Sequence, residues 1–441
     1  MKPWHVLSNT VLLDCSPWLR VYREHVRLPI RVALPAALPA GRYELTLKAA
    51  FSGGELQEDA FAIEVLPEPP AVGTALRIAV LDPNGETREL LSQMDVSFDS
   101  VTADADLAAY DLLIVGKHAL TLVNPLPDLS RVQDGLKVLM FEQSNEVLQN
   151  RLGFRTQEYA LRRVFPRMAG HPALAGLRAE HLRDWRGEGT TVPPRLAVSM
   201  EPHGGYPRVQ WCGFSVPRAW RAGCLGSVAS VLIEKPSAGD FLPILDGGFS
   251  LQYAPLLEHR HGAGLILFCQ MDVTGRTQQD PAAARLAGNL IRYVGGWEAP
   301  VRRGLVYAGE DAGRAHLAAA GFEPAPPGAD RPASADVLVT GPGAGKELAP
   351  HADRIARWLA AGGRLVVLGQ DAEEIGSYLH LQVATETRRY TCGALAPPSP
   401  AAAVAGIGSA DLLDRAPRER PLIADGAQTL ADGVLALAEH A

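Results

Sequence analysis

Lys137-Val-Leu-Met-Phe-Glu-Gln143 is the stretch of sequence that decides the fold. After Lys137, four consecutive residues are apolar, without the alternation of a strand that has one face in water. Such a run is typical of a parallel strand that is buried on both faces of its sheet. Two polar residues end the run, and Ser144–Leu152 then shows a helical pattern. The stretch therefore predicts a strand, a turn and a helix in succession.

Similar units surround this stretch, and together they span residues 75–299. Further buried strands are predicted at 76–81, 111–116 and 264–269, short helices at 87–94 and 281–294, and antiparallel additions at 228–233 and 241–245. Strands that alternate with helices favour a doubly wound, flavodoxin-like parallel sheet. We therefore predict one open α/β domain over 75–299, with an insertion rich in Trp and Arg.

Residues 303–441 repeat this pattern. Asp336-Val-Leu-Val-Thr-Gly341 matches Asp111-Leu-Leu-Ile-Val-Gly116, and Arg364-Leu-Val-Val-Leu-Gly-Gln370 matches the opening stretch at nearly the same spacing. Chance similarity between apolar strands is the alternative to a repeat. The second copy ends at Ala441, before any counterpart of strand 264–269, so we expect it to be truncated at its C-terminus.

Residues 1–70 show a different pattern. Strands are expected at 26–34, 41–51 and 61–66, and Tyr43, Leu45 and Leu47 share one face of the second. Short strands at this spacing suggest an immunoglobulin-like β-sandwich. Pro67-Glu-Pro-Pro70 then forms a stiff linker.

Composition and charge exclude several classes of protein. The chain has 441 residues, of which 47% are hydrophobic and 21% charged, which is typical of a soluble globular protein. Its net charge of −7 gives no basic footprint, so we expect no nucleic acid partner. No apolar run approaches the roughly 20 residues that span a bilayer, so we expect no membrane partner, and no signal-peptide pattern follows Met1.

Neither a metal nor a cofactor is predicted. The five cysteines form no CxxC pair and no Cys/His cluster of zinc spacing. Gly341-Pro-Gly-Ala-Gly-Lys346 is similar to a phosphate-binding loop, but Thr340 replaces its first glycine and Glu347 its Ser or Thr. His259 and His261 beside Glu258 suggest either a metal-binding arm or a solvated strand edge.

Ligands of open α/β sheets bind beyond the carboxyl ends of the strands. This rule selects Gly116-Lys117-His118, Glu142-Gln143-Ser144 and Gln270-Met271-Asp272. Glu142 occupies the turn where a class I glutamine amidotransferase-like fold has its nucleophilic cysteine, so amidotransferase chemistry is not expected. Glu142 and Asp272 are candidate acid and base residues. One alternative is that Glu142 binds backbone amides at a helix N-terminus. The other is that the loop with Asp272 and Asp280-Pro281 forms the cap of the following helix.

A second set of candidates lies in the insertion and in the loop after strand 264–269. It comprises Trp185, Arg186, Trp211, Trp220 and Arg276. Aromatic and arginine side chains are typical anchors of interfaces, and aromatic faces also stack on sugar rings. The alternative is a small hydrophobic subcore with solvated arginines. Cys269 ends a buried strand, where we expect it to serve as a small hydrophobe.

Several blocks resemble C-terminal regions of large bacterial glycoside hydrolases similar to glycoside hydrolase family 2 β-galactosidases. They are Val138–Gln143, Leu182–Gly187, Ile233–Pro236, Leu245–Phe249 and Phe268–Arg276. The α/β part also resembles the amidotransferase-like trimerisation domain of other β-galactosidases, which lacks a working nucleophile.

The resemblance implies a non-catalytic accessory region. Its partners would be the catalytic barrel of the same parent chain, further copies of itself in a homo-oligomer, or carbohydrate. No catalytic residue of the family can be carried over, because a barrel takes roughly 250 residues in eight βα units and no eightfold run exists here. Two alternatives remain: an independent hydrolase that uses Glu142 and Asp272, and a carbohydrate-binding module.

Overall fold

The computed structural model describes two compact units of the chain, Met1–Pro67 and Glu68–Ala441. Within them, the described residues are 35, 38–51, 53–73, 75–186, 197–203, 206–211, 214–216, 226–300, 303–328, 332–334, 336–395, 403–404 and 406–439. No helix in these ranges combines the length and the apolar character needed to cross a membrane.

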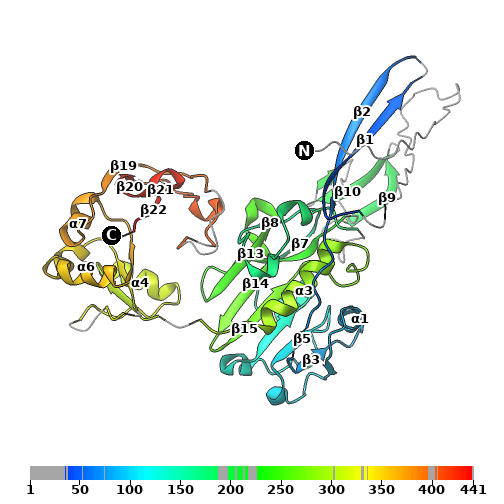
Figure 1. Ribbon diagram of the computed structural model, residues 1–441, viewed down its shortest axis with the longest axis horizontal. Helices are drawn as coiled ribbons and strands as arrows, with labels where there is room; N and C mark the ends of the chain where they lie inside the picture. The colour runs from blue at the N-terminus through cyan, green and yellow to red at the C-terminus, as the bar shows by residue number, and fades with distance from the viewer. Residues whose placement is uncertain are drawn as a thin grey trace. The chain divides into compact units, whose positions relative to one another are not determined.

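The first unit contains an antiparallel hairpin (Figure 1). Strand β1 (Gly41–Ala50) pairs with β2 (Leu56–Val65), and Leu45 lies opposite Phe61. Strands were predicted in both places. The third expected strand, at 26–34, lies outside the described residues, so the β-sandwich stays a prediction.

Residues 76–299 are organised by a ten-stranded mixed sheet. Its parallel half has the spatial order β4 (Asp99–Ser100), β3 (Ile78–Leu81), β5 (Leu112–Val115), β6 (Lys137–Met140) and β15 (Gly264–Cys269). The antiparallel half continues with β14 (Tyr253–His261), β12 (Ala229–Glu234) and β7 (Thr156–Leu161), while β13 (Phe241–Gly247) pairs with β14 and β8 (Phe165–Pro166). The sheet is thus parallel where the apolar runs predicted it.

Three helices accompany this sheet: α1 (Glu86–Gln93), α2 (Asn145–Asn150) and α3 (Pro281–Gly295). Asp280 begins α3 by accepting a hydrogen bond from the Ala282 amide, and Pro281 occupies the first turn, where no amide proton is needed. Within the insertion, β9 (Ala197–His203), β10 (Tyr206–Trp211) and β11 (Phe214–Val216) form a separate antiparallel sheet. All three helices lie where the sequence predicts them.

The sequence did not predict β14, the longest strand beside the parallel half. Its second half reads Glu258-His-Arg-His261, which looks like a solvated segment. Glu258 is nevertheless fully buried, because His171 and Tyr293 contact its carboxylate from other elements. Local polarity therefore misleads where distant residues neutralise it.

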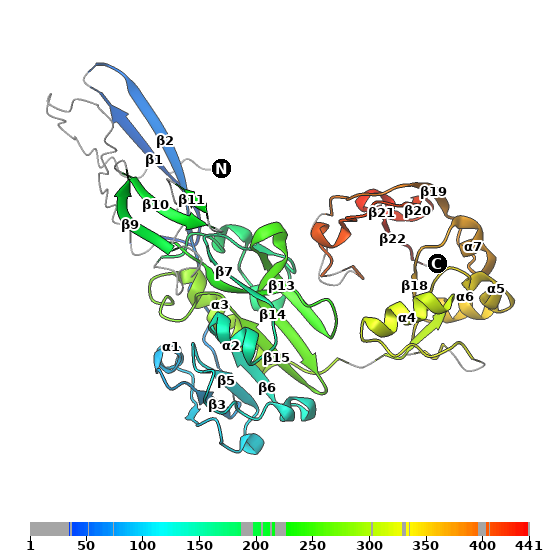
Figure 2. The same cartoon turned by 180° about the vertical axis from the view of Figure 1, so that it is seen from behind.

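A second parallel sheet lies within residues 305–367. Its order is β16 (Leu305–Ala308), β17 (Val337–Thr340) and β18 (Arg364–Val367) (Figure 2). The helices of this region are α4 (Asp311–Ala319), α5 (Ala344–Leu348), α6 (Ala352–Ala360) and α7 (Ala372–Tyr378). Two antiparallel pairs follow, β19 (Ala384–Arg389) with β20 (Glu419–Asp425) and β21 (Gln428–Leu430) with β22 (Leu435–Leu437). The chain is therefore a mixed α/β protein, rich in strands.

Each of the two parallel sheets has an equivalent hydrogen bond at the end of its middle strand. The Gln143 side-chain amide donates to the Gly116 carbonyl at 2.7 Å, and that of Gln370 donates to the Gly341 carbonyl at 2.6 Å. Both glutamines are buried. These are the glycines and glutamines that the sequence matching aligns.

Gly264, the first residue of β15, packs closely against the neighbouring backbone. A β-carbon there would overlap the carbonyl oxygens of Val132 and Leu136. Gly264→Ala should therefore lower the free energy of unfolding by about 1–3 kcal/mol, measured by urea denaturation. Gly73→Ala is the matched control, because no atom lies within 4 Å of its added β-carbon. Equal midpoints for the two variants would contradict this account of the packing.

Candidate functional site

Polar residues follow the parallel strands of the first sheet at one edge. We call them the strand-end cluster: Asp82, Lys117, His118, Glu142, Gln143, Gln270, Asp272, Thr274 and Arg276. Carboxyl ends of parallel strands meet at the same edge, so the sequence rule brought most of these residues together correctly. All of them except Lys117 and His118 are buried.

Glu142 is 2% exposed, and both of its carboxyl oxygens are engaged by one residue. The Thr274 amide donates to Oε1 at 2.9 Å, and the Thr274 hydroxyl donates to Oε2 at 2.8 Å. Burial raises the pKa of Glu142 to about 7, since the Thr274 hydrogen bonds offset the desolvation only in part and the Asp272 charge adds to it. Glu142 does bind a backbone amide, but the prediction that this amide belongs to the next helix is wrong. Ser144 caps that helix instead.

Asp272 is 1% exposed and lies in a second hydrogen-bonded group. Its Oδ2 accepts from the hydroxyls of Ser227 and Ser230, both at 2.8 Å, and Arg276 Nη2 lies 3.5 Å away. Arg276 also donates to the Ser227 carbonyl. Of the residues expected to cap the following helix, Asp280 does so and Asp272 does not. Arg276, expected at an interface, is buried against Asp272.

Gln143 connects the strand ends. Besides Gly116, its side-chain amide donates to the Phe141 carbonyl at 2.8 Å, and its Oε1 accepts from the Leu120 amide at 3.1 Å. Its backbone amide donates to Gln270 Oε1 at 3.2 Å. The buried side chain of Gln143 thus joins the ends of β5 and β6, and its backbone amide adds the end of β15.

Neither His118, a member of the cluster, nor the adjacent Cys269 is activated by its surroundings. Burial lowers the pKa of His118, and the charge of Lys117 lowers it further, so the ring is neutral at pH 7. Burial raises the pKa of the Cys269 thiol well above its usual range, and the Glu142 and Asp272 charges raise it further. Cys269 is therefore a protonated, buried thiol, as expected for a small hydrophobe.

The tryptophans of the insertion are described only in part. Trp185 is 1% exposed, and its indole donates to the His181 carbonyl at 2.8 Å, as in the subcore alternative. Arg186 is exposed. Trp211 ends β10 with its side chain outside the description, and Trp220 lies outside the described residues. An interface formed by these residues stays a prediction.

Glu258, His259 and His261 do not converge on one point. The His259 ring stacks on Phe241 with centroids 4.2 Å apart, whereas Glu258 meets His171 Nε2 at 3.5 Å and the Tyr293 hydroxyl. Burial by itself would raise the pKa of Glu258. Hydrogen bonds from His171 and Tyr293 and the charge of Arg260 outweigh this effect and hold the pKa below its usual range. No group of three or more His, Cys, Asp or Glu side chains in the described ranges could hold a metal ion.

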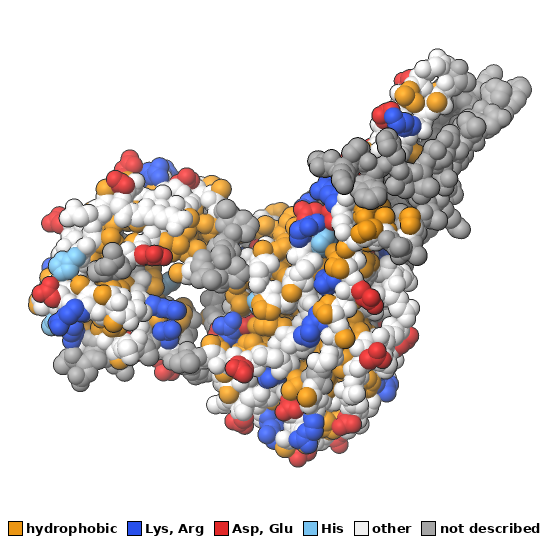
Figure 3. Space-filling model, in the orientation of Figure 1, with side chains coloured by type: hydrophobic (Ala, Val, Ile, Leu, Met, Phe, Trp, Pro, Cys, Tyr) orange, Lys and Arg blue, Asp and Glu red, His pale blue; other side chains and the backbone are white. Residues whose placement is uncertain are grey.

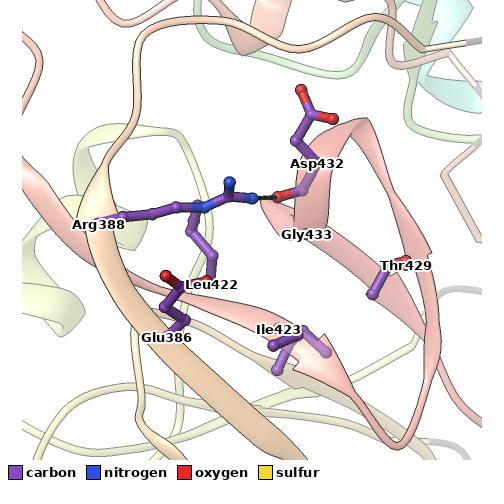
Figure 4. A pocket seen from close by; sticks show the side chains of 8 residues that line it. Glu386, Arg388, Leu422, Ile423, Thr429, Asp432 and Gly433 are labelled. Carbon is purple, nitrogen blue, oxygen red and sulfur yellow. Dashed lines mark hydrogen bonds between the residues drawn. The ribbon is translucent and has the colours of Figure 1, made fainter.

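A depression of about 280 Å³ lies in the last part of the chain (Figure 4). Its lining comprises Glu386, Arg388, Leu422, Ile423, Ala424, Thr429, Asp432 and Gly433. The Arg388 guanidinium donates to the Asp432 carbonyl at 2.6 Å. No residue that the sequence singled out lines this depression.

Figure 3 shows Lys and Arg side chains interspersed with Asp and Glu on the displayed face. A nucleic-acid-binding surface requires basic residues gathered along one face or helix. The view shows no such gathering among the residues described on that face.

No protein-family model matches the chain, and no curated protein matches it. Solved structures that are similar include two cytoplasmic proteins of Salmonella typhimurium. The first is 11% identical, with a TM-score of 0.27, and the match covers 57% of this chain and 96% of the other. The second is 11% identical, with a TM-score of 0.25, and the match covers 58% and 96%.

The raised pKa of Glu142 makes stability depend on pH. The folded chain holds this proton up to about pH 7, whereas an unfolded glutamate releases it near 4.5. The stabilisation is fully present below pH 4.5 and is lost as the pH rises towards 7. Glu142→Gln, which cannot ionise, should gain on the order of 3 kcal/mol relative to wild type between pH 4 and pH 8.

Urea denaturation across this pH range measures the effect. The exposed Glu146, in helix α2, supplies the control Glu146→Gln, which should follow wild type. A Glu142→Gln curve parallel to wild type would show that folding does not raise the pKa of this carboxyl.

The Asp272–Arg276 pair gives a second test. Asp272→Asn removes the carboxylate charge beside a buried guanidinium, so it should cost about 3 kcal/mol of stability. The control is Asp184→Asn, because the Arg162–Asp184 pair has side chains that are 60% and 47% exposed. That variant should cost less than about 1 kcal/mol. Equal losses in thermal or urea unfolding would refute a buried ion pair.

Proposed function

We propose that the chain is a non-catalytic accessory region of a carbohydrate-active glycoside hydrolase, where it supports the catalytic barrel or oligomerisation. The observation that carries the proposal is the closure of the strand-end cluster. In open α/β proteins this edge binds the ligand, yet here Glu142 is held at both oxygens by Thr274 and Asp272 by two serines and Arg276. Side chains of the chain itself fill the place of a substrate.

The blocks that resemble family 2 glycosidases support a structural role. Val138–Gln143 and Phe268–Arg276 supply buried strands and the strand-end cluster. Ile233–Pro236 and Leu245–Phe249 are joined by Lys235, whose Nζ lies 3.0 Å from Asp246 Oδ1. These sequence blocks thus coincide with internal packing and internal hydrogen bonds.

We also infer that the two parallel sheets are tandem flavodoxin-like, amidotransferase-like copies. Numbered along the chain, the parallel strands of the first sheet have the order 2-1-3-4-5, which is the flavodoxin-like order. The second sheet keeps the order of the counterparts of β3, β5 and β6. The equivalent hydrogen bonds of Gln143 and Gln370 support a repeat over chance similarity between the two sequences.

One observation favours the alternative of an independent hydrolase. A carboxyl group with a pKa near 7 beside a second carboxylate suits general acid–base catalysis. Such a residue must reach its substrate, however, and Glu142 and Asp272 are 2% and 1% exposed. Their burial supports the proposed accessory role over the hydrolase.

Enzyme assays separate the two functions. The purified chain should show no turnover of aryl glycosides, esters or amides above the buffer rate between pH 5 and pH 8. Glu142→Gln and Glu146→Gln should leave that result unchanged. Turnover that disappears in Glu142→Gln and persists in Glu146→Gln would overturn the accessory role.

A further inference from the structure

Strand β18 has one open edge. It pairs with β17 and with no other strand in the described part of the chain. The Leu368 amide donates to the Thr340 carbonyl of β17 at 2.8 Å. Because successive amides alternate in direction along a strand, those of Leu365 and Val367 point to the open side. Unpaired amides of this kind are a template for another strand.

One face of β18 is open as well. Val366 and Leu368 are 43% and 42% exposed. Leu365 and Val367, on the opposite face, pack against the core of this region. On the face of Val366, the neighbouring strands are covered, since Tyr307 and Val339 are buried with Leu317 of α4. The apolar gap is therefore confined to β18.

The first sheet shows what closes the corresponding gap. Leu139 and Phe141 of the matching stretch are fully buried. Strand β15 pairs with β6 in parallel and occupies its edge. Helix α3 contacts β6, and Lys137 Nζ donates to the Gly295 carbonyl at 2.8 Å.

The position of α3 follows from the packing of the two faces of β6. Val138 and Met140 belong to a core cluster that contains no residue of α3. Helix α3 therefore covers the other face, that of Leu139 and Phe141. A strand followed by a helix closes both the edge and the face.

We propose that the edge of β18 and the side chains of Val366 and Leu368 form a docking surface for a strand–helix unit of a partner polypeptide. The strand would be apolar and would run parallel to β18, as β15 does beside β6. The helix would present small and aliphatic residues, as α3 presents Ala283, Leu286 and Leu290 to its own sheet. This surface stands independently of any link to a glycosidase.

A second copy of the chain fits this surface less well. Two β18 strands paired edge to edge would join only four residues from each chain. Stable interfaces bury about 1,200–2,000 Å², which two such strands cannot supply. A helix packed over Val366 and Leu368 adds the missing apolar area.

Hydrogen exchange of the full chain tests the proposal. The probe is residues 262–297 of this chain, which carry β15 and α3, fused to a soluble carrier protein. In the free chain, the amides of Leu365 and Val367 should exchange much faster than those of Val138 and Met140. The probe should slow them by at least about tenfold.

Matched variants make the result specific. Val366→Lys with Leu368→Lys should abolish the effect, and circular dichroism should show an unchanged fold because both side chains are exposed. A probe with Leu286→Lys and Leu290→Lys should also fail. Three outcomes would overturn the proposal: amides already protected in a monomeric free chain, protection that accompanies a doubled mass, or exchange that the probe leaves unchanged.

Discussion

The hydrogen bonds of Gln143 are the interaction on which the rest of the first sheet depends. Its buried side chain joins the ends of β5 and β6, and its backbone amide bonds to Gln270 after β15. A buried amide that loses a partner costs about 1–3 kcal/mol, so each contact fixes the position of a strand end. Glu142 and Gln270 are the neighbours of this glutamine in sequence or in space.

The strand-end cluster contains two carboxyl groups that form hydrogen bonds within the chain itself. The turn after β6 holds a residue that could ionise, and a second carboxylate lies close enough to raise its pKa. Glu142 nevertheless bonds to Thr274 in the loop after β15, and Asp272 bonds to Ser227 and Ser230 at the start of β12. The edge where open α/β sheets bind ligands is crossed here by hydrogen bonds between side chains of the chain itself.

The sequence predicted the elements with the strongest local signals. The continuous apolar runs identified β3, β5, β6 and β15, and the Asp280-Pro281 pair located the start of α3. The sequence also placed Glu142 and Asp272 on the same edge. It could not identify Ser227 and Ser230 as partners of Asp272, because they lie far back in the chain and belong to no recognisable motif. Burial of Glu258 was equally out of reach, since it depends on contacts with other elements.

Strand β15 has a parallel neighbour on one side and an antiparallel neighbour on the other. Its antiparallel partner β14 is joined to it by the tight turn at Gly262-Ala263, so this hairpin can form on a microsecond timescale. Pairing with β6 instead requires closure of the whole segment 141–263, whose loop entropy slows the step. The order of folding is thereby set: the hairpin forms early as a local unit, and the seam with the parallel strands closes late.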